Sequence, residues 1–186
     1  SPVVFEETFD QTSGTGGHDG SFSGNIASST IKYDNNDPSN TWSATKCGGA
    51  DKCVKFGTSD TDGVLTTPAI ALDGASYALL TFSAAGWADK STKVINTLTI
   101  TANEGFELSG DNVIAELEKM VWNEYTVLIK VNTSDNLQLT FTGKRGFLDD
   151  VVVRKITTVP TPSLPADFTF FPNTTEVKGS KSVTLT

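Results

Sequence analysis

The chain has 186 residues, of which 37% are hydrophobic and 19% charged, so it is long enough for one β domain, or for one domain plus a fragment of another. Its formal net charge of −8 argues against nucleic acid as a partner, because phosphate binding needs clustered Lys and Arg. No apolar run approaches the roughly 18 residues that span a bilayer. No signal pattern precedes Ser1, which indicates a mature or trimmed chain.

Segments rich in Val, Ile, Thr and aromatic residues dominate the sequence, and clusters of Gly, Asp and Asn separate them at short intervals. This pattern predicts many short strands, and hence a sandwich or a barrel. The predicted strands are 3–9, 52–58, 63–72, 76–87, 96–102, 124–131, 137–143 and 147–156.

The first predicted strand carries a carboxylate on its apolar face. Alternation with a period of two places Phe5, Glu7 and Phe9 on one side of the strand. If the phenylalanines face the core, Glu7 does so too and needs a partner.

The loop-rich region that follows holds candidates for ligand binding. Sugars stack on exposed aromatic rings, and Trp42, Tyr33 and Phe22 lie beside polar loops. The alternative is that Trp42 packs in the core, as we expect for Trp87 and Trp122, which lie at the ends of strands. His18 has no second His nearby in the sequence, and we interpret it as a solvated loop residue.

The two cysteines, Cys47 and Cys53, enclose a Gly-Gly-containing segment. Their spacing does not fit a C-x₂-C metal pair, and His18 alone cannot complete a zinc site. We predict a small disulfide, which would suit an exported protein, with two reduced thiols as the alternative.

The segment 111–122 is ambiguous. Its apolar residues have helical spacing and Asp111 could cap a helix. Because the segments on both sides read as strands, we expect a strand with a turn here.

The last strand, 147–156, contains Asp149 and Asp150 among apolar residues. Alternation places Asp149 on the same side as Phe147, Val151 and Val153, and leaves Asp150 facing solvent. A bulge would reverse this assignment.

A calcium ion between the first and last strands would neutralise Glu7 and Asp149 if these strands are neighbours. Nearby loops offer further oxygen ligands, including Asp10, Asp34 and Asn35. One alternative is that each carboxylate bonds to backbone amides, Lys or Arg. Another is that the two carboxylates are the acid and the nucleophile of a glycosidase.

Beyond residue 156 the composition changes. Prolines at 160, 162 and 165 predict an extended linker over 157–167, so the first domain covers 1–156. Residues 168–186 have strand-turn-strand character and are too few to bury a core. We interpret them as the start of a second β domain, or as an arm that docks on the first.

Four ordered motifs, "FEETFD", "KFGTS", "TTPAI" and "FLDDV", carry a resemblance to jelly-roll domains from surface and secreted proteins of Gram-negative gut anaerobes. The chain is similar to cleaved-adhesin, MAM and galactose-binding-like carbohydrate-binding modules over roughly 3–155. The resemblance implies a two-sheet antiparallel jelly-roll β-sandwich whose first and last strands are close, with a structural calcium near them. The tail resembles the first strands of an immunoglobulin-like domain.

The expected function is a non-catalytic binding module, secreted or on the cell surface, attached to the outer membrane or in the periplasm. Its expected partner is a glycan or a cell-surface protein. Two alternatives are a protein-adhesion or spacer domain without a glycan site, and an accessory domain of a glycoside hydrolase. The fold itself does not name the ligand.

Overall fold

The computed structural model describes residues 1–24, 30–58, 60–88 and 96–157. Apart from Thr157, the predicted linker and the predicted second domain lie outside these residues. Strands form the framework of the described part, with one 3₁₀ turn, η1 (Asp111–Val113). The strands are β1 (Val3–Glu7), β2 (Ser43–Thr45), β3 (Cys47–Ala50), β4 (Cys53–Phe56), β5 (Gly63–Thr66), β6 (Tyr77–Gly86), β7 (Asn96–Ala102), β8 (Phe106–Ser109), β9 (Ile114–Leu117), β10 (Asn123–Val131), β11 (Leu139–Gly143) and β12 (Gly146–Ile156).

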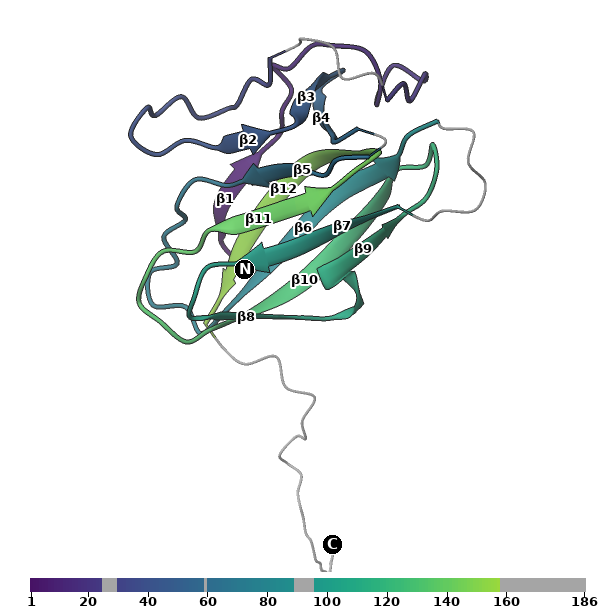
Figure 1. The fold of residues 1–186 in the computed structure, drawn as a ribbon. Helices are drawn as coiled ribbons and strands as arrows, with labels where there is room; N and C mark the ends of the chain where they lie inside the picture. Colours follow the sequence, from purple (N-terminus) through teal and green to yellow (C-terminus); the bar gives the residue numbers. More distant parts are fainter. Residues whose placement is uncertain (25–29, 59, 89–95, 158–186) are drawn as a thin grey trace, which may run out of the picture.

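Within the described residues, these strands form two antiparallel sheets that pack face to face (Figure 1). The larger sheet has the order β3-β4-β12-β6-β10-β8, and β1 also pairs with β12. The smaller sheet has the order β2-β5-β11-β7-β9. The protein is therefore a two-sheet antiparallel jelly-roll β-sandwich, as predicted, and its first and last strands are direct neighbours.

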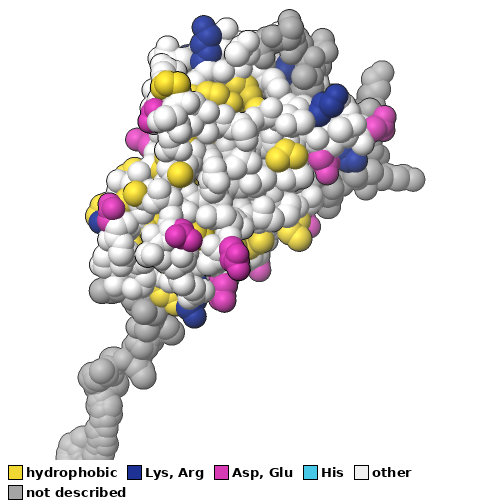
Figure 2. Space-filling view, turned by 60° about the vertical axis from the view of Figure 1, so that its left-hand side comes forward, with side chains coloured by type: hydrophobic (Ala, Val, Ile, Leu, Met, Phe, Trp, Pro, Cys, Tyr) yellow, Lys and Arg dark blue, Asp and Glu magenta, His cyan; other side chains and the backbone are white. Residues whose placement is uncertain are grey.

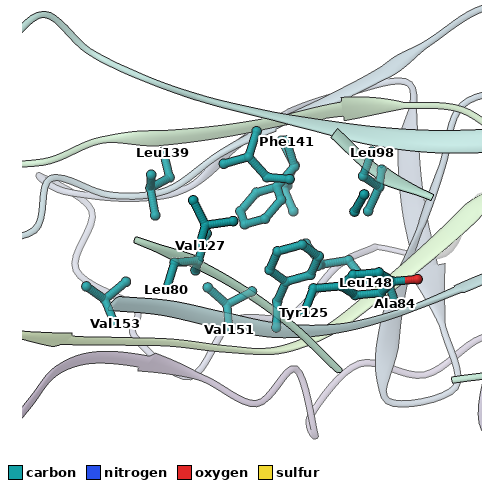
Figure 3. Close-up of a cluster of buried hydrophobic side chains, with 14 of the residues drawn as sticks. Leu80, Ala84, Leu98, Tyr125, Val127, Leu139, Phe141, Leu148, Val151 and Val153 are labelled. Atoms are coloured by element: carbon teal, nitrogen blue, oxygen red, sulfur yellow. The ribbon is translucent and has the colours of Figure 1, made fainter. Parts of the chain in front are cut away.

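The main core fills the space between the sheets. Alternate residues of β10 and β6 point inward from the larger sheet, and alternate residues of β7 and β11 point inward from the smaller one (Figure 3). Phe82 and Phe141 meet across the core edge to face, with ring centroids 5.4 Å apart. The period-two alternation that predicted these strands is the physical reason that both sheets bury one face.

A second, smaller cluster lies on the other face of the larger sheet. Ala50, Cys53, Ala85, Trp87 and Phe147 form it, and Phe22 and Trp122 pack against it. The loop 10–24, which we call the strap, covers this cluster and follows β1 across the end of the sandwich beside β3 and β4 (Figure 1).

Glycines let the strap lie close to the sheet. A Cβ at Gly14 would come within 2.4 Å of the Gly49 carbonyl oxygen, and one at Gly17 within 2.3 Å of the Cys53 sulfur. Gly17 also has a φ of 85°, which disfavours other residues. The glycines of the "SGTGG" segment are therefore needed, because side chains at these positions would push the strap away from the sheet.

Strand β12 contains a β-bulge at the two aspartates. Asp149 pairs with Ser83 of β6 and Val152 with Thr81, so β12 has one residue more than β6 between these pairs. Asp150 has a φ of 50° there. Leu148, Val151 and Val153 face the main core, whereas Phe147 faces the second cluster.

The predicted common face of Phe147, Asp149, Val151 and Val153 is thus wrong, because the extra residue at the bulge reverses the alternation. Asp149 faces away from the main core, on the side of Phe147. Asp150 is exposed, as predicted.

The ambiguous segment is confirmed as a strand with a turn: η1 leads into β9, and a turn over residues 118–122 follows.

Replacing Phe141 with Ala should lower the free energy of unfolding by about 3–5 kcal/mol, because this ring is fully buried between the sheets. Thr101→Ala, on the exposed face of β7, should cost less than about 1 kcal/mol and is the matched control. Urea unfolding followed by tryptophan fluorescence measures both. Equal losses in the two variants would contradict the placement of the core.

Candidate functional site

Glu7 lies at the end of β1 on the inner side of the larger sheet, as the alternation predicted. It pairs with Val151 of β12, and its side chain is 1% exposed. Its carboxylate accepts hydrogen bonds of 3.0 Å from the amides of Phe9 and Asp34. Burial raises the pKa of Glu7 to about 7, the two amides oppose this rise, and the charge of Asp34 adds to it.

Asp34 brings a second carboxylate to Glu7. Its Oδ2 atom accepts a hydrogen bond of 2.7 Å from the Thr8 amide, and the Thr8 hydroxyl also donates to this carboxylate. The structure therefore joins two of the predicted calcium ligands, Glu7 and Asp34.

Asp149 has a different partner. Its Oδ2 atom is 2.6 Å from Nε2 of His18, and Oδ1 accepts a bond of 2.8 Å from the Asp150 amide. Burial raises the pKa of Asp149 to about 6, and the hydrogen bond with His18 opposes this rise. Asp10 lies near the neighbouring carboxyl, where its charge contributes to raising the pKa of Asp150, after burial.

His18 lies in a loop and is exposed, as interpreted from the sequence, but it also has two partners that the sequence did not indicate. Its ring stacks on Trp122 with centroids 4.4 Å apart and planes 10° from parallel. The partners lie 131 and 104 residues further along the chain, so no local pattern could have identified them. Trp122 packs on Phe147 at 6.2 Å, which agrees with the predicted packing role.

Glu7 and Asp149 do not form one cation site. Glu7 lies on the side of the main core and Asp149 on the side of the second cluster, so the larger sheet separates them. Among the residues described, no group of three or more His, Cys, Asp or Glu side chains is arranged to hold a metal ion. The residues fit a shared Glu7–Asp149 ion poorly, and calcium stays a prediction that depends on Glu7 and Asp34.

A buried amine and a buried thiol lie on the same face of β4, beneath the strap. Lys55 is fully buried, and its Nζ atom donates a hydrogen bond of 2.6 Å to the Thr15 carbonyl. Burial lowers the pKa of Lys55 and raises that of the Cys53 thiol. A buried thiol kept in its neutral form is a poor nucleophile, so His18, Asp149 and Cys53 do not make a catalytic triad.

The predicted disulfide between Cys47 and Cys53 is wrong, because both cysteines are free. In the β3–β4 hairpin, Cys53 pairs with Ala50 while Cys47 pairs with Phe56. The two cysteines lie three residues apart along the hairpin, about 10 Å, whereas a disulfide needs Cα atoms within about 7 Å. They also face opposite sides, since Cys47 packs on the main core and Cys53 on the second cluster.

Two of the three predicted sugar-stacking aromatics, Trp42 and Tyr33, lie together, and the third, Phe22, lies apart from them. Trp42 is 6% exposed, belongs to the main core and stacks on Tyr33 with centroids 5.5 Å apart. This is the position that the core alternative described. Phe22 lies on the other side of the larger sheet, half-buried against Phe147.

The outer face of the smaller sheet is rich in threonine, a feature that the sequence reading did not single out. Leu98, Ile100 and Phe141 point into the core, so their neighbours along β7 and β11 point outward. Thr66 and Thr140 meet on this face, with their hydroxyl oxygens 3.0 Å apart. The "TLTIT" and "LTFT" segments were the available signal, because each alternates threonine with core residues.

A groove of about 190 Å³ lies on this face, and we call it the threonine groove. Asp62, Asn96, Thr97, Thr99, Thr142, Gly143 and Lys144 line it. Among the described residues, none makes a side-chain hydrogen bond with these six side chains, and none of the lining residues is aromatic. The groove therefore presents hydroxyl, amide, carboxylate and ammonium groups that can bond to a ligand.

Uncharged polar side chains and backbone make up most of the middle of the molecular face in Figure 2. Hydrophobic side chains occur there in small groups, and most acidic side chains lie around the margin. No helix among the described residues is long and apolar enough to cross a membrane.

The chain matches no protein-family description and no curated protein. Among solved structures, it is similar to the CBM22-1 xylan-binding domain from Paenibacillus barcinonensis Xyn10C, with 10% identity, a TM-score of 0.46 and coverage of 85% of this chain and 97% of that one. It is also similar to the K3 cleaved adhesin domain of Lys-gingipain from Porphyromonas gingivalis w83, with 15% identity, a TM-score of 0.41 and coverage of 82% and 97%. Both are of the kinds that the sequence resembles, and neither likeness identifies a ligand here.

The raised pKa of Glu7 predicts that metal-free protein loses stability as the pH rises. The folded state holds this proton up to about pH 7, whereas the unfolded chain releases it near 4.5. The stabilisation is complete below 4.5 and lost as the pH passes through 7, and the difference corresponds to as much as about 3 kcal/mol. Urea unfolding in EDTA should therefore give a steeper pH dependence for the native chain than for Glu7→Gln.

Asp149 also has a raised pKa, so Glu7→Gln should flatten the pH dependence without abolishing it. Identical pH profiles for the native chain and the variant would contradict the assignment to Glu7.

Proposed function

We propose that this domain is a non-catalytic binding module that holds a glycan in the threonine groove. The observation that carries the proposal is the lining of the groove, where six polar side chains converge and none bonds to another described residue. Sites for small polar ligands place a few such groups in a concave surface to fix orientation.

The chemistry of the lining suits a polyhydroxylated ligand. A threonine hydroxyl both donates and accepts, an amide does both through separate atoms, a carboxylate accepts and an ammonium donates. Sugar hydroxyls also act in both ways, so each lining group finds a complement on a sugar. A net contribution of about 0.5–1.5 kcal/mol for each neutral hydrogen bond supports modest affinity, which increases with the number of sugar units in contact.

The position of the groove supports the same proposal. The threonines that line it stand on β7 and β11, whose paired strands form the middle of the smaller sheet. The backbone under the ligand is thus held by strand pairing on both sides, and the binding groups need little ordering when the ligand arrives.

We also propose that calcium, if bound, lies at Glu7 and Asp34. Two adjacent carboxylates of which one has a raised pKa repel each other when both are ionised, and a divalent cation would relieve this repulsion. The Thr8 hydroxyl, which already contacts Asp34, is a further oxygen at this place.

Thr142→Val should weaken glycan binding about 3- to 10-fold, because it removes one hydroxyl and keeps the shape of the side chain. Thr101→Val is the matched control, on the same face but outside the groove lining. A glycan array with the native domain identifies a ligand, and calorimetry compares the variants. An array that stays blank, with and without calcium, would overturn the proposal in favour of an adhesion or spacer role.

Calcium should raise the melting temperature of EDTA-treated protein at about pH 8, because an ion that binds only the folded state stabilises it. Glu7→Gln and Asp34→Asn should each remove this effect, whereas Asp149→Asn should retain it. Differential scanning fluorimetry measures all four proteins. An unchanged melting temperature of the native domain would rule out calcium at this place.

A further inference from the structure

The strap places the His18 ring where a binding site would hold a ring of its ligand. One face of the imidazole lies on the indole of Trp122, with centroids 4.4 Å apart and planes 10° from parallel. Its Nε2 atom meets the Asp149 carboxylate at 2.6 Å. An aromatic platform and a carboxylate at the edge of the ring are the two groups that commonly orient a bound sugar.

The platform has a hydrogen-bonding group that His18 does not use. The indole Nε1 of Trp122 is buried and has no hydrogen-bond partner among the described residues. A buried donor without a partner costs free energy, so its retention calls for an explanation. A ligand larger than imidazole, with hydroxyl groups around its ring, offers an acceptor for this donor.

The strap is attached to the sheet on both sides of His18. After His18, the Ala88 amide donates a hydrogen bond of 2.9 Å to the Phe22 carbonyl, and the Phe22 ring packs on Phe147. The other attachments precede His18. Lys52 donates from its amide to the Thr12 carbonyl, Asp51 to the Gly16 carbonyl, and Lys55 Nζ to the Thr15 carbonyl. Beyond these bonds, Gly17 and Gly20 flank His18 and Asp19 with φ values of 85° and 82°. Because Gly17 bridges to Asp51 and Phe22 is bonded to Ala88, the displacement of His18 that the proposal requires is a rotation of its side chain, with the attached parts of the strap in place.

His18 also remains accessible, because its side chain is 36% exposed. A ligand can therefore reach the edge of the imidazole without unfolding of the main core. Asp149, by contrast, is 4% exposed, and its Oδ2 atom is in contact with His18, so a ligand that bonds to this atom must displace the imidazole.

From this geometry we propose that His18 is an internal plug of a second site, formed by Trp122 and Asp149, that binds a pyranose ring. The apolar C–H face of the sugar stacks on the indole in place of the imidazole. One sugar hydroxyl donates to Asp149, and another accepts from Nε1 of Trp122. The plug lowers the apparent affinity because the ligand must first displace it.

This second site is separate from the threonine groove. It lies on the outer side of the larger sheet, whereas the groove lies on the outer side of the smaller sheet. The inference shares a ligand class with the proposed function but uses none of the groove residues, so each can fail without the other.

Two variants test the plug in the full chain. His18→Gly removes the ring, and His18→Asn keeps a side-chain donor but removes the stacking, which gives a second variant if the first folds poorly. The probes are imidazole and the methyl glycosides of glucose, galactose and mannose, with tryptophan fluorescence and calorimetry as readouts. Thr142→Val is included in every series to reduce the contribution of the groove, which is then the same for all the variants compared.

We expect at least one methyl glycoside to bind the His18 variants about tenfold or more tighter than the native domain. Adding Trp122→Ala or Asp149→Asn should abolish this binding, and imidazole should compete with the sugar. No glycoside binding by either variant would overturn the proposal, even if imidazole raises their melting temperature. Equal glycoside affinity for native and His18→Gly protein would also overturn it, because His18 would then not act as a plug.

Discussion

The sandwich depends on strand β12, which changes its pairing partner along one of its edges. One edge of β12 pairs with β6 along most of its length, while the other edge pairs first with β4 and then with β1. The bulge at Asp149 and Asp150 lies where this change occurs. Without the extra residue, a strand that buries Leu148 in the main core would present Val151 and Val153 to the opposite face. The bulge therefore allows one strand to contribute side chains to both the main core and the second cluster. At the bulge, Asp150 has a left-handed backbone conformation, with φ 50°.

The same bulge separates the two buried carboxylates. Glu7 pairs with Val151 beyond the bulge and faces the main core, whereas Asp149 precedes the bulge and faces the second cluster. The two buried carboxylates are stabilised by different partners. Glu7 retains its proton to a higher pH beside two backbone amides and Asp34, and Asp149 bonds to an imidazole from the strap. The bond to His18 in turn holds the strap over Trp122 and Phe147.

The period-two alternation of apolar and polar side chains predicted the strands correctly wherever no bulge or turn interrupts the alternation. The eight segments predicted as strands all contain strands, and the orientation of Glu7 was correct because β1 is regular from Phe5 onward. Asp149 was misplaced because a bulge depends on how the neighbouring strands pair, which no local pattern records. The disulfide failed for a related reason: the sequence spacing allows it, but the hairpin register sends Cys47 and Cys53 to opposite faces. The short strands β2 and β3 were not predicted because they lack runs of β-branched residues. The contacts of His18 were not predicted because its partners lie far along the chain.

The two outer faces of the sandwich differ, and this difference bears on function more than the fold does. On the larger sheet, the strap covers part of the outer face. Its His18 ring stacks on Trp122 and bonds to Asp149, so the Asp149 carboxylate there is already engaged. On the smaller sheet, threonines of β7 and β11 stand in register on adjacent strands, on a surface supported by strand pairing. The polar side chains of the groove, which make no side-chain hydrogen bond with a described residue, contribute little to stability, since each is already hydrated in the unfolded chain. The polar lining of this groove suits the polyhydroxylated ligand that we propose for it.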